Sequence, residues 1–288
     1  MKREPSAVVR AALWMVGTLS SFSLLAVATR ELSADYSSLQ IVFFRNTVGL
    51  AIMLPVVASI GWSRIRSRNM RLQVVRNVIH LAASFGWYQG IAVLSLAEVF
   101  AIEFTAPFWV ALMAVFLLGE RMNRGRAIAL IFGLIGMLII LRPGFGSFSL
   151  GSFYVLAAAI GFAATHIATK RLTGTDTVAM VLFWMVLIQF PISAVAAVFS
   201  WSALSWGMVP WALLIGVTGL SAHLCMTKAL RLADATVVIP MDFLRLPLIA
   251  VVGFAVYSEA LDAFVLIGAL IMFSGNYVSI RRERAAED

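Results

Sequence analysis

The sequence predicts an all-α integral membrane protein in which ten transmembrane helices form two inverted five-helix repeats. Three observations lead to this fold class. Apolar residues make up 61% of the 288-residue chain and charged residues only 12%, whereas a soluble domain averages about 45–50% and 25%. Ten apolar segments follow one another along the chain. The two halves of the chain also resemble each other.

The ten apolar segments have the lengths of membrane spans, since a spanning helix needs about 20 mostly apolar residues. They are 9–29, 39–60, 73–94, 97–119, 125–141, 150–169, 177–199, 208–229, 235–257 and 261–280. The connections between them are short. We therefore expect little protein mass outside the bilayer.

The basic residues predict the orientation of these spans. Eighteen of the 22 Lys and Arg residues fall in alternate connections and the two end segments, and the opposite set holds only Arg30 and Arg142. Positively charged loops stay on the cytoplasmic side, so both termini are expected in the cytoplasm of a bacterium, with the protein in its inner membrane. The net charge of +8 then reflects topology and contact with anionic lipid headgroups rather than nucleic-acid binding.

The internal repeat has an offset of about 140 residues. Glu120 matches Glu259 and Gly136 matches Gly275 at an offset of 139, and the triplet 96–98 matches 232–234 at 136. Five spans per repeat is an odd number, which places the second copy upside down in the membrane. The first segment imitates a signal peptide, but the repeat needs it as its first helix, so we expect it to be retained.

The predicted domains follow from this repeat. They are a first five-helix repeat, 1–142, a linker, 143–149, and a second five-helix repeat, 150–288. Inverted repeats are a transporter architecture, with the substrate site near the midplane between the halves.

The ninth span is interrupted by polar and helix-breaking residues. It carries Pro240, Asp242, Arg245 and Pro247 in its first half. Ionisable residues at membrane depth cost about 2.5–3.5 kcal/mol each on insertion scales, and broken backbone there is tolerated only beside protein or a water-filled cavity. We interpret this stretch as the wall of a transport pathway. The alternative is a helix in which Asp242 and Arg245 only pair with each other.

The fourth span offers a second acid, Glu103, with Pro107 four residues later. A proline removes one helical hydrogen bond, so a carboxylate and a free carbonyl are expected together, a combination that suits a substrate ammonium or a proton. The alternative is a buried acid that stays protonated.

Histidines lie in spans three, six and eight, at positions 80, 166 and 223. Histidine changes charge most easily near neutral pH, which favours a proton relay or a substrate contact, although a neutral packing role is the more common one. Their spacing matches no metal motif. We expect no metal and no cofactor.

Span three also carries aromatic residues. His80, Ser84 and Trp87 fall on one helical face, with Tyr88 beside it, and Trp14 and Thr18 share a face of span one. Such a lining suits a planar apolar substrate. The alternative is that these aromatic residues face lipid or mark the membrane interface.

Two further features of spans two and three carry structural predictions. Gly86 and Gly90 form a GxxxG motif, which permits close helix contact. Arg45 lies in span two, about 7.5 Å along the helix from Gln40, and we expect its side chain to extend outward to the interface.

These features resemble the drug/metabolite transporter superfamily, and within it the EamA-type transporters. The residues that carry the resemblance are Leu96-Ala97-Glu98, Pro107, Gly119-Glu120, Gly133 and Gly136 in the first half, Leu232-Ala233-Asp234, Pro247, Glu259, Gly268 and Gly275 in the second, and Gln40 with Arg45 in span two. Ser258-Glu259 departs from the Gly-Glu pair of the first half.

The resemblance implies a basket of ten helices around a central cavity lined by spans one, three, four, six, eight and nine. It also implies a small metabolite as substrate, with amino acids, including aromatic ones, as a common choice. The predicted cavity residues are Trp14, Thr18, His80, Trp87, Tyr88, Glu103, Phe104, Pro107, His166, His223, Asp242 and Arg245.

The predicted function is secondary transport by alternating access, with export of amino acids as the leading hypothesis and no enzymatic activity. No GxxxxGK[ST] loop for ATP is present. The alternatives are an importer or facilitator of another metabolite or an amphipathic cation, and more remotely an intramembrane enzyme. Proton coupling and facilitated diffusion are both compatible with the sequence, as are a monomer and a homo-oligomer.

Overall fold

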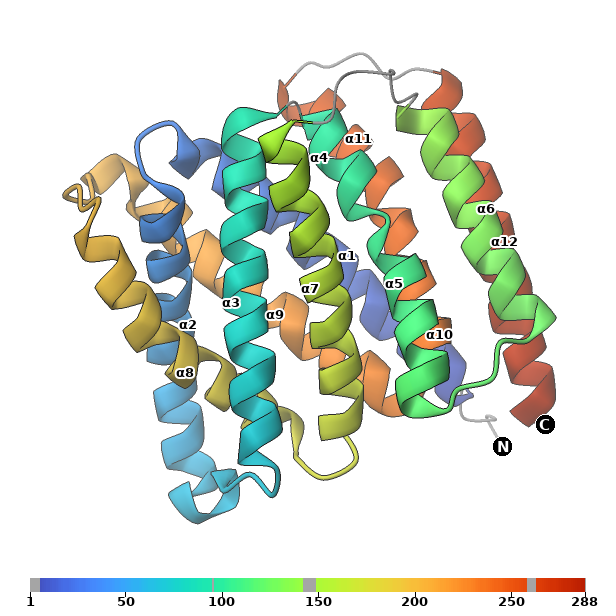
Figure 1. The fold of residues 1–288 in the computed structure, drawn as a ribbon, viewed down its shortest axis with the longest axis horizontal. Coiled ribbons are helices and arrows are strands. Elements are labelled where there is room, and N and C mark those ends of the chain that lie inside the picture. Colours follow the sequence, from blue (N-terminus) through green and yellow to red (C-terminus); the bar gives the residue numbers. More distant parts are fainter. Residues whose placement is uncertain (1–5, 95, 142–148, 258–262, 288) are drawn as a thin grey trace.

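The structure, a computed structural model, describes residues 6–94, 96–141, 149–257 and 263–287, and every regular element among them is helical. Eight helices are continuous (Figure 1). They are α1 (Ala7–Ser33), α2 (Ser38–Ile60), α3 (Met70–Val93), α6 (Arg124–Leu141), α7 (Leu150–Leu172), α8 (Val178–Val198), α9 (Val209–Leu232) and α12 (Ala263–Glu287).

Two further spans are divided into pieces. The fourth consists of α4 (Leu96–Glu103), α5 (Ala106–Met113) and the π turn η2 (Ala114–Leu118), and the ninth of α10 (Ala235–Val238), the 3₁₀ turn η4 (Ile239–Leu244) and α11 (Arg245–Tyr257). Short 3₁₀ turns, η1 (Trp62–Ile65) and η3 (Trp206–Met208), lie in connections. Counted in this way, the described residues form the ten predicted spans.

The boundaries follow local sequence signals. Ser37, Ser149 and Thr177 each accept a hydrogen bond from the backbone N–H three residues on, which satisfies a donor that a helix start leaves free. Pro107 and Pro240 stand in the first turns of α5 and η4, where a missing N–H costs no helical bond. Proline therefore divides the fourth and ninth spans at their polar residues.

Five helical stretches are long and apolar enough to cross a membrane without help from the others. They are α1, α2, α7, α8 and the stretch Trp206–Leu232, while the fourth span contributes only a shorter apolar piece, Ala106–Leu118. Helix α12 continues to Glu287, past the predicted end of the last span at residue 280, because charged residues mark where a helix leaves the bilayer and not where it ends.

Helix packing follows the repeat. Helix α1 packs along α9, and their counterparts in the other half, α7 and α3, pack along each other in the same way. Helices α2 and α8 are counterparts that pack together, as are α6 and α12. The start of α1 and the end of α12 lie at the same end of the bundle (Figure 1), as five spans per inverted repeat require.

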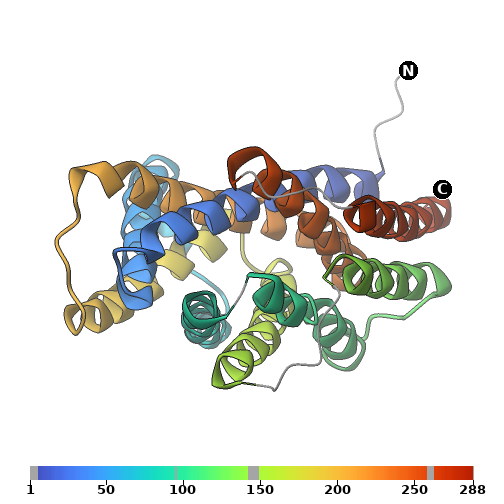
Figure 2. The same ribbon diagram turned by 90° about the horizontal axis from the view of Figure 1, so that it is seen from above.

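The α2–α8 and α6–α12 pairs stand at opposite ends of the molecule, with the other six spans between them (Figures 1 and 2). Helices α3 and α7 approach closely because of two glycines. A Cβ on Gly86 would lie 2.9 Å from the Tyr154 carbonyl oxygen, and one on Gly90 would overlap Val155 Cγ2. The predicted GxxxG contact is therefore confirmed.

Two predicted features lie outside the described residues. They are the linker 143–149, apart from Ser149, and the Ser258-Glu259 pair.

Candidate functional site

A central cavity lies among the six middle spans. It contains about 740 Å³ of space free of atoms, including the part open to solvent. Spans one, three, four, six, eight and nine all contribute to its wall, as predicted, and span two adds Arg45. The lining residues are Phe22, Leu25, Arg45, His80, Ser84, Trp87, Tyr88, Glu103, Ala106, Phe162, Thr165, His166, His223, Asp242 and Arg245.

Two carboxylates share one guanidinium in this wall. Arg245 Nη2 lies 2.5 Å from Glu103 Oε1 and 3.0 Å from Asp242 Oδ2. Glu103 ends α4 in the first repeat, whereas Asp242 and Arg245 belong to the broken ninth span of the second. Arg245 thus pairs with its neighbour, which was the simple alternative, and also joins the two halves. We call these three residues the acid cluster.

The acid cluster holds two carboxyl groups and one guanidinium, so with both acids ionised it carries one negative charge more than its arginine balances. Trp87 Nε1 donates to Glu103 Oε2 at 2.6 Å, so both oxygens of Glu103 are used. Asp242 Oδ1 and Arg245 Nε are buried and have no hydrogen-bond partner among the described residues. Buried polar groups without partners are rare in proteins. The acid cluster therefore presents one free acceptor and one free donor.

Aromatic rings surround the acid cluster. The guanidinium carbon of Arg245 lies 5.3 Å from the Phe22 ring centroid and 5.2 Å from that of Phe104, within the range of a cation–π contact. Trp87 and Tyr88 meet edge to face at 5.4 Å. The Tyr88 hydroxyl is buried and has no hydrogen-bond partner in the part of the chain that the structure describes. The cavity thus combines flat apolar walls with unused hydrogen-bonding groups.

The three histidines all line the cavity rather than facing lipid. His80 and His223 meet edge to face with centroids 4.6 Å apart, and Phe22 packs against His223 at 5.7 Å. Gln189 Nε2 lies 3.0 Å from His80 Nδ1. No group of three metal-binding side chains occurs in the parts of the chain that the structure describes.

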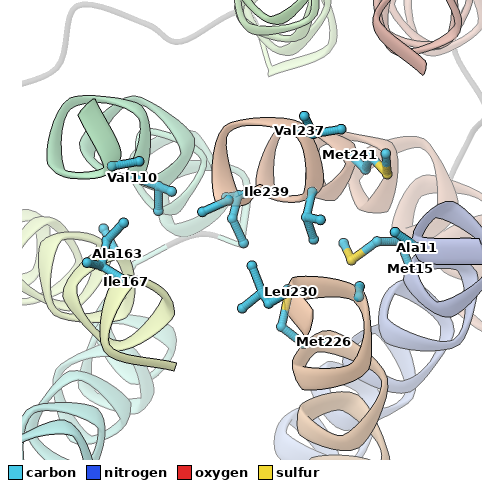
Figure 3. Packing of buried hydrophobic residues seen from close by; sticks show 14 of the residues in the cluster. Ala11, Met15, Val110, Ala163, Ile167, Met226, Leu230, Val237, Ile239 and Met241 are labelled. Atoms are coloured by element: carbon cyan, nitrogen blue, oxygen red, sulfur yellow. The ribbon is translucent and has the colours of Figure 1, made fainter. Parts of the chain in front are cut away.

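An apolar cluster closes the end of the bundle that holds the chain termini. We call it the terminus-side plug. Met15, Leu230 and Ile239 from three different spans face one another in it (Figure 3). On α1 the plug precedes the cavity residues, and on α9 it follows them, so it lies between the cavity and the chain ends. Its buried members are Val8, Ala11, Met15, Val110, Ala114, Ala163, Ile167, Met226, Ala229, Leu230, Ala235, Val237, Val238, Ile239 and Met241.

A polar network backs the plug at the same end. Gly119 adopts φ +69°, a left-handed conformation that favours glycine, and the next residue is Glu120. Its carboxylate accepts from the backbone N–H groups of Ala235 and Thr236, both at 2.9 Å. The Gly-Glu pair of span four therefore caps the start of span nine.

Arg126 adds ionic contacts to this network. It lies 2.9 Å from both Glu283 Oε1 and Asp234 Oδ2. The hydrogen bond from Arg126 lowers the pKa of Glu283, which lies beyond the last span. The plug end is therefore held by spans four, five and nine and the C-terminal segment together.

The family model for the EamA-like transporter family matches residues 9–142 and 149–281, once in each half. The chain belongs to the EamA-like transporter family. A riboflavin transporter of Rhizobium johnstonii is 29% identical over 99% of this chain and 95% of its own length. An S-adenosylmethionine uptake transporter of Rickettsia bellii is 24% identical over 95% and 94%.

Two further comparisons extend the likeness to a third named relative and, for the fold alone, to a solved structure. A pseudopaline exporter of Pseudomonas aeruginosa is 25% identical over 88% of this chain and 89% of its own. A solved crystal structure, 18% identical, superposes with a TM-score of 0.82 over 96% of this chain and 99% of that one. The three named relatives are transporters, for uptake as well as export.

Eight of the twelve predicted site residues line the cavity of this EamA-like transporter, and four do not. Trp14 lies under Lys228, whose Nζ is 4.0 Å from the ring centroid, and packs on the plug. Thr18 is fully buried and donates to the Trp14 carbonyl. Phe104 stacks on Phe243 behind Arg245. Pro107 is buried at the start of α5.

Sequence reasoning missed other cavity residues. Phe22, Phe162 and Thr165 carry no charge and do not break a helix, so no sequence signal separates them from packing residues. The expectation that Arg45 extends outward is wrong, because its side chain turns inward and is 9% exposed. A signal did exist for the acids. Glu103 and Asp242 are 139 residues apart, the offset that relates Glu120 to Glu259.

Proposed function

We propose that this chain is a secondary transporter for a small organic metabolite that carries a cationic group and an aromatic ring. The observation that carries the proposal is the acid cluster, in which two carboxylates from opposite repeats share one arginine inside an aromatic-lined cavity. Its extra negative charge calls for a positive partner, since unbalanced buried charge is costly. A substrate ammonium meets that need.

A proton also neutralises the excess negative charge of the acid cluster, and this gives a mechanism that couples substrate transport to proton movement. One excess negative charge accepts either a proton or a substrate cation, so each displaces the other. The repeat architecture supplies two arrangements, open to one side or the other, as in other inverted-repeat transporters. Exchange of an inward-moving proton for an outgoing substrate then drives export. This reasoning favours the predicted export of amino acids, including aromatic ones.

The distribution of basic residues predicts which side of the membrane the terminus-side plug faces. The basic connections and both termini are assigned to the cytoplasm, so the terminus-side plug closes the cavity toward the cytoplasm of a bacterial inner membrane. The halves that exchange arrangements are residues 1–142 and 150–288, joined by the linker 143–149. Opening the plug requires the contacts between span nine and spans four and five to break.

A second candidate is the uptake of a neutral planar heterocycle such as riboflavin. Two observations favour it. The Rhizobium johnstonii relative is named as a riboflavin transporter. The unpartnered Asp242 Oδ1, Arg245 Nε and Tyr88 hydroxyl offer an acceptor, a donor and a group that does both, which suits the alternating edge of a heterocycle.

Counterflow in proteoliposomes separates these candidates. Vesicles loaded with excess unlabelled aromatic amino acid, S-adenosylmethionine or riboflavin are given the same compound labelled outside. The proposal expects accumulation of a cationic aromatic compound, its inhibition at acid pH, and loss of both in Glu103→Gln. Accumulation of riboflavin alone supports the second candidate. Flux of none of these compounds contradicts both.

A further inference from the structure

We propose that Arg45, Ser84 and His80 form an oxyanion subsite in the cavity, which binds a carboxylate of the substrate. This inference rests on the proposed transport function and adds the second charged group of the substrate. Arg45 comes from span two, which otherwise takes no part in the cavity wall. Its side chain is buried, yet it lines the cavity together with Ser84 and His80.

Packing against α9 directs Arg45 inward. A Cβ on Gly219 would lie 3.1 Å from both Cγ and Cδ of Arg45, so the arginine stem passes over a glycine that leaves it room. One turn earlier, Gly216 allows equally close packing, since a Cβ there would overlap the Val48 side chain. The two glycines bring α9 against α2 and place the guanidinium among the middle spans.

The positive charge of Arg45 has no protein counter-ion among the described residues. Its Nη1 donates to Ser84 Oγ at 3.2 Å and its Nη2 to Gln189 Oε1 at 3.0 Å, and both partners are neutral. Burying a charge without a counter-ion costs several kcal/mol, and buried arginines are therefore usually paired with an anionic group. An anion that enters the cavity supplies the missing partner.

The hydrogen bonds around Arg45 leave only donors for a ligand. A guanidinium can only donate, so the amide oxygen of Gln189 faces it and the amide nitrogen faces His80 Nδ1, 3.0 Å away. Nδ1 of His80 therefore accepts, and the proton of the neutral ring lies on Nε2. Ser84 accepts from Arg45, which leaves its hydroxyl proton free. A guanidinium, an imidazole N–H and a hydroxyl together recognise an oxyanion.

The two charged regions of the cavity complement a zwitterion. The lining holds Arg45 and Arg245 against Glu103 and Asp242, so the formal charges cancel over the whole wall. They do not cancel locally, because Arg245 already pairs with both acids. The acid cluster is left negative and the Arg45 subsite positive. The substrate class that fits is a compound with a carboxylate, an ammonium and an aromatic ring.

The test uses matched ligands that differ only in the carboxylate. Tryptophan with tryptamine, tyrosine with tyramine and histidine with histamine are compared as inhibitors and substrates of counterflow. For a transported pair, the wild-type protein should bind the amino acid about tenfold or more tightly than the amine, because one charge-assisted hydrogen bond contributes a factor of this size. Arg45→Gln should lose that preference by weakening amino-acid binding while amine binding stays unchanged.

Two variants guard against misfolding. Arg45→Lys keeps the charge and should retain part of the preference, and Ser84→Ala should reduce it by a smaller factor than Arg45→Gln. A wild type that treats amino acid and amine alike overturns the subsite but leaves the transport function standing. An Arg45→Gln variant in which the binding of amino acid and amine is weakened equally has the same consequence. Absence of flux for every pair and for riboflavin instead contradicts the transport function itself.

Discussion

Replacing Arg245 tests the charge arithmetic of the acid cluster. Arg245→Met leaves two buried carboxylates without a counter-charge, and removing one partner of a buried ion pair costs about 3–5 kcal/mol. The side chains of Arg245 and Glu103 are 7% and 8% exposed, so solvent cannot compensate. We therefore expect a loss of this size in the free energy of unfolding.

A second variant separates charge imbalance from lost packing. Glu103→Gln, Asp242→Asn and Arg245→Met combined remove all three charges, and the glutamine introduced at position 103 can still accept the Trp87 indole hydrogen bond through its amide oxygen. Replacing buried ion pairs by neutral groups of similar volume is often close to neutral in stability. The triple variant should therefore recover most of the stability lost in Arg245→Met while transport stays absent.

Unfolding of purified protein in detergent, followed by tryptophan fluorescence during an SDS titration, gives the comparison. Arg245→Lys serves as the matched control, since it keeps the charge but not the forked geometry, and should fall between wild type and Arg245→Met. A triple variant no more stable than Arg245→Met would refute the charge argument. It would show that Arg245 acts through packing alone.

Three further predictions concern packing and the plug end. Gly133→Ala should destabilise the fold by about 1–3 kcal/mol in the same titration, because the new Cβ would overlap the Phe243 ring, whereas Gly207→Ala, with nothing within 4 Å, should be neutral. Glu283→Gln should cost about 0.2–1 kcal/mol at neutral pH by weakening the Arg126 contact, and equal stability of variant and wild type there would contradict it. Arg126 lowers the pKa of Glu283 below its ordinary value of 4.5. The stability that Glu283 contributes is therefore complete above pH 4.5 and is lost as the pH falls through the lowered pKa. Below that pH, variant and wild type should unfold alike.

Much of the architecture could be predicted from the sequence because the bilayer imposes strong rules on it. Apolar length and proline position predicted ten spans and the break in span nine. The glycine pair of span three predicted a close helix contact, and the structure shows that α7 is the partner. These signals are local, and each follows from backbone geometry or from the cost of polar groups in lipid.

The cavity wall was harder to predict because it depends on which side of each helix faces inward. Arg45 shows the difficulty. Its position near the beginning of span two suggested an outward path, but Gly219, more than 170 residues away in sequence, opens an inward one. Trp14 and Thr18 share the correct helix but lie closer to its start than Phe22, and so belong to the plug side. Side-chain direction across the bundle is set by such distant partners.

Accessibility of the cavity from each side of the membrane tests the central claim most directly. Cys225 is the single cysteine of the chain, so Cys225→Ala with Ala106→Cys places one thiol on the cavity wall. In oriented vesicles, a membrane-impermeant thiol reagent should label it from the side opposite the chain termini, and substrate should shift labelling to the terminus side. Labelling from both sides at once, or a pattern that substrate leaves unchanged, would contradict alternating access by two inverted halves.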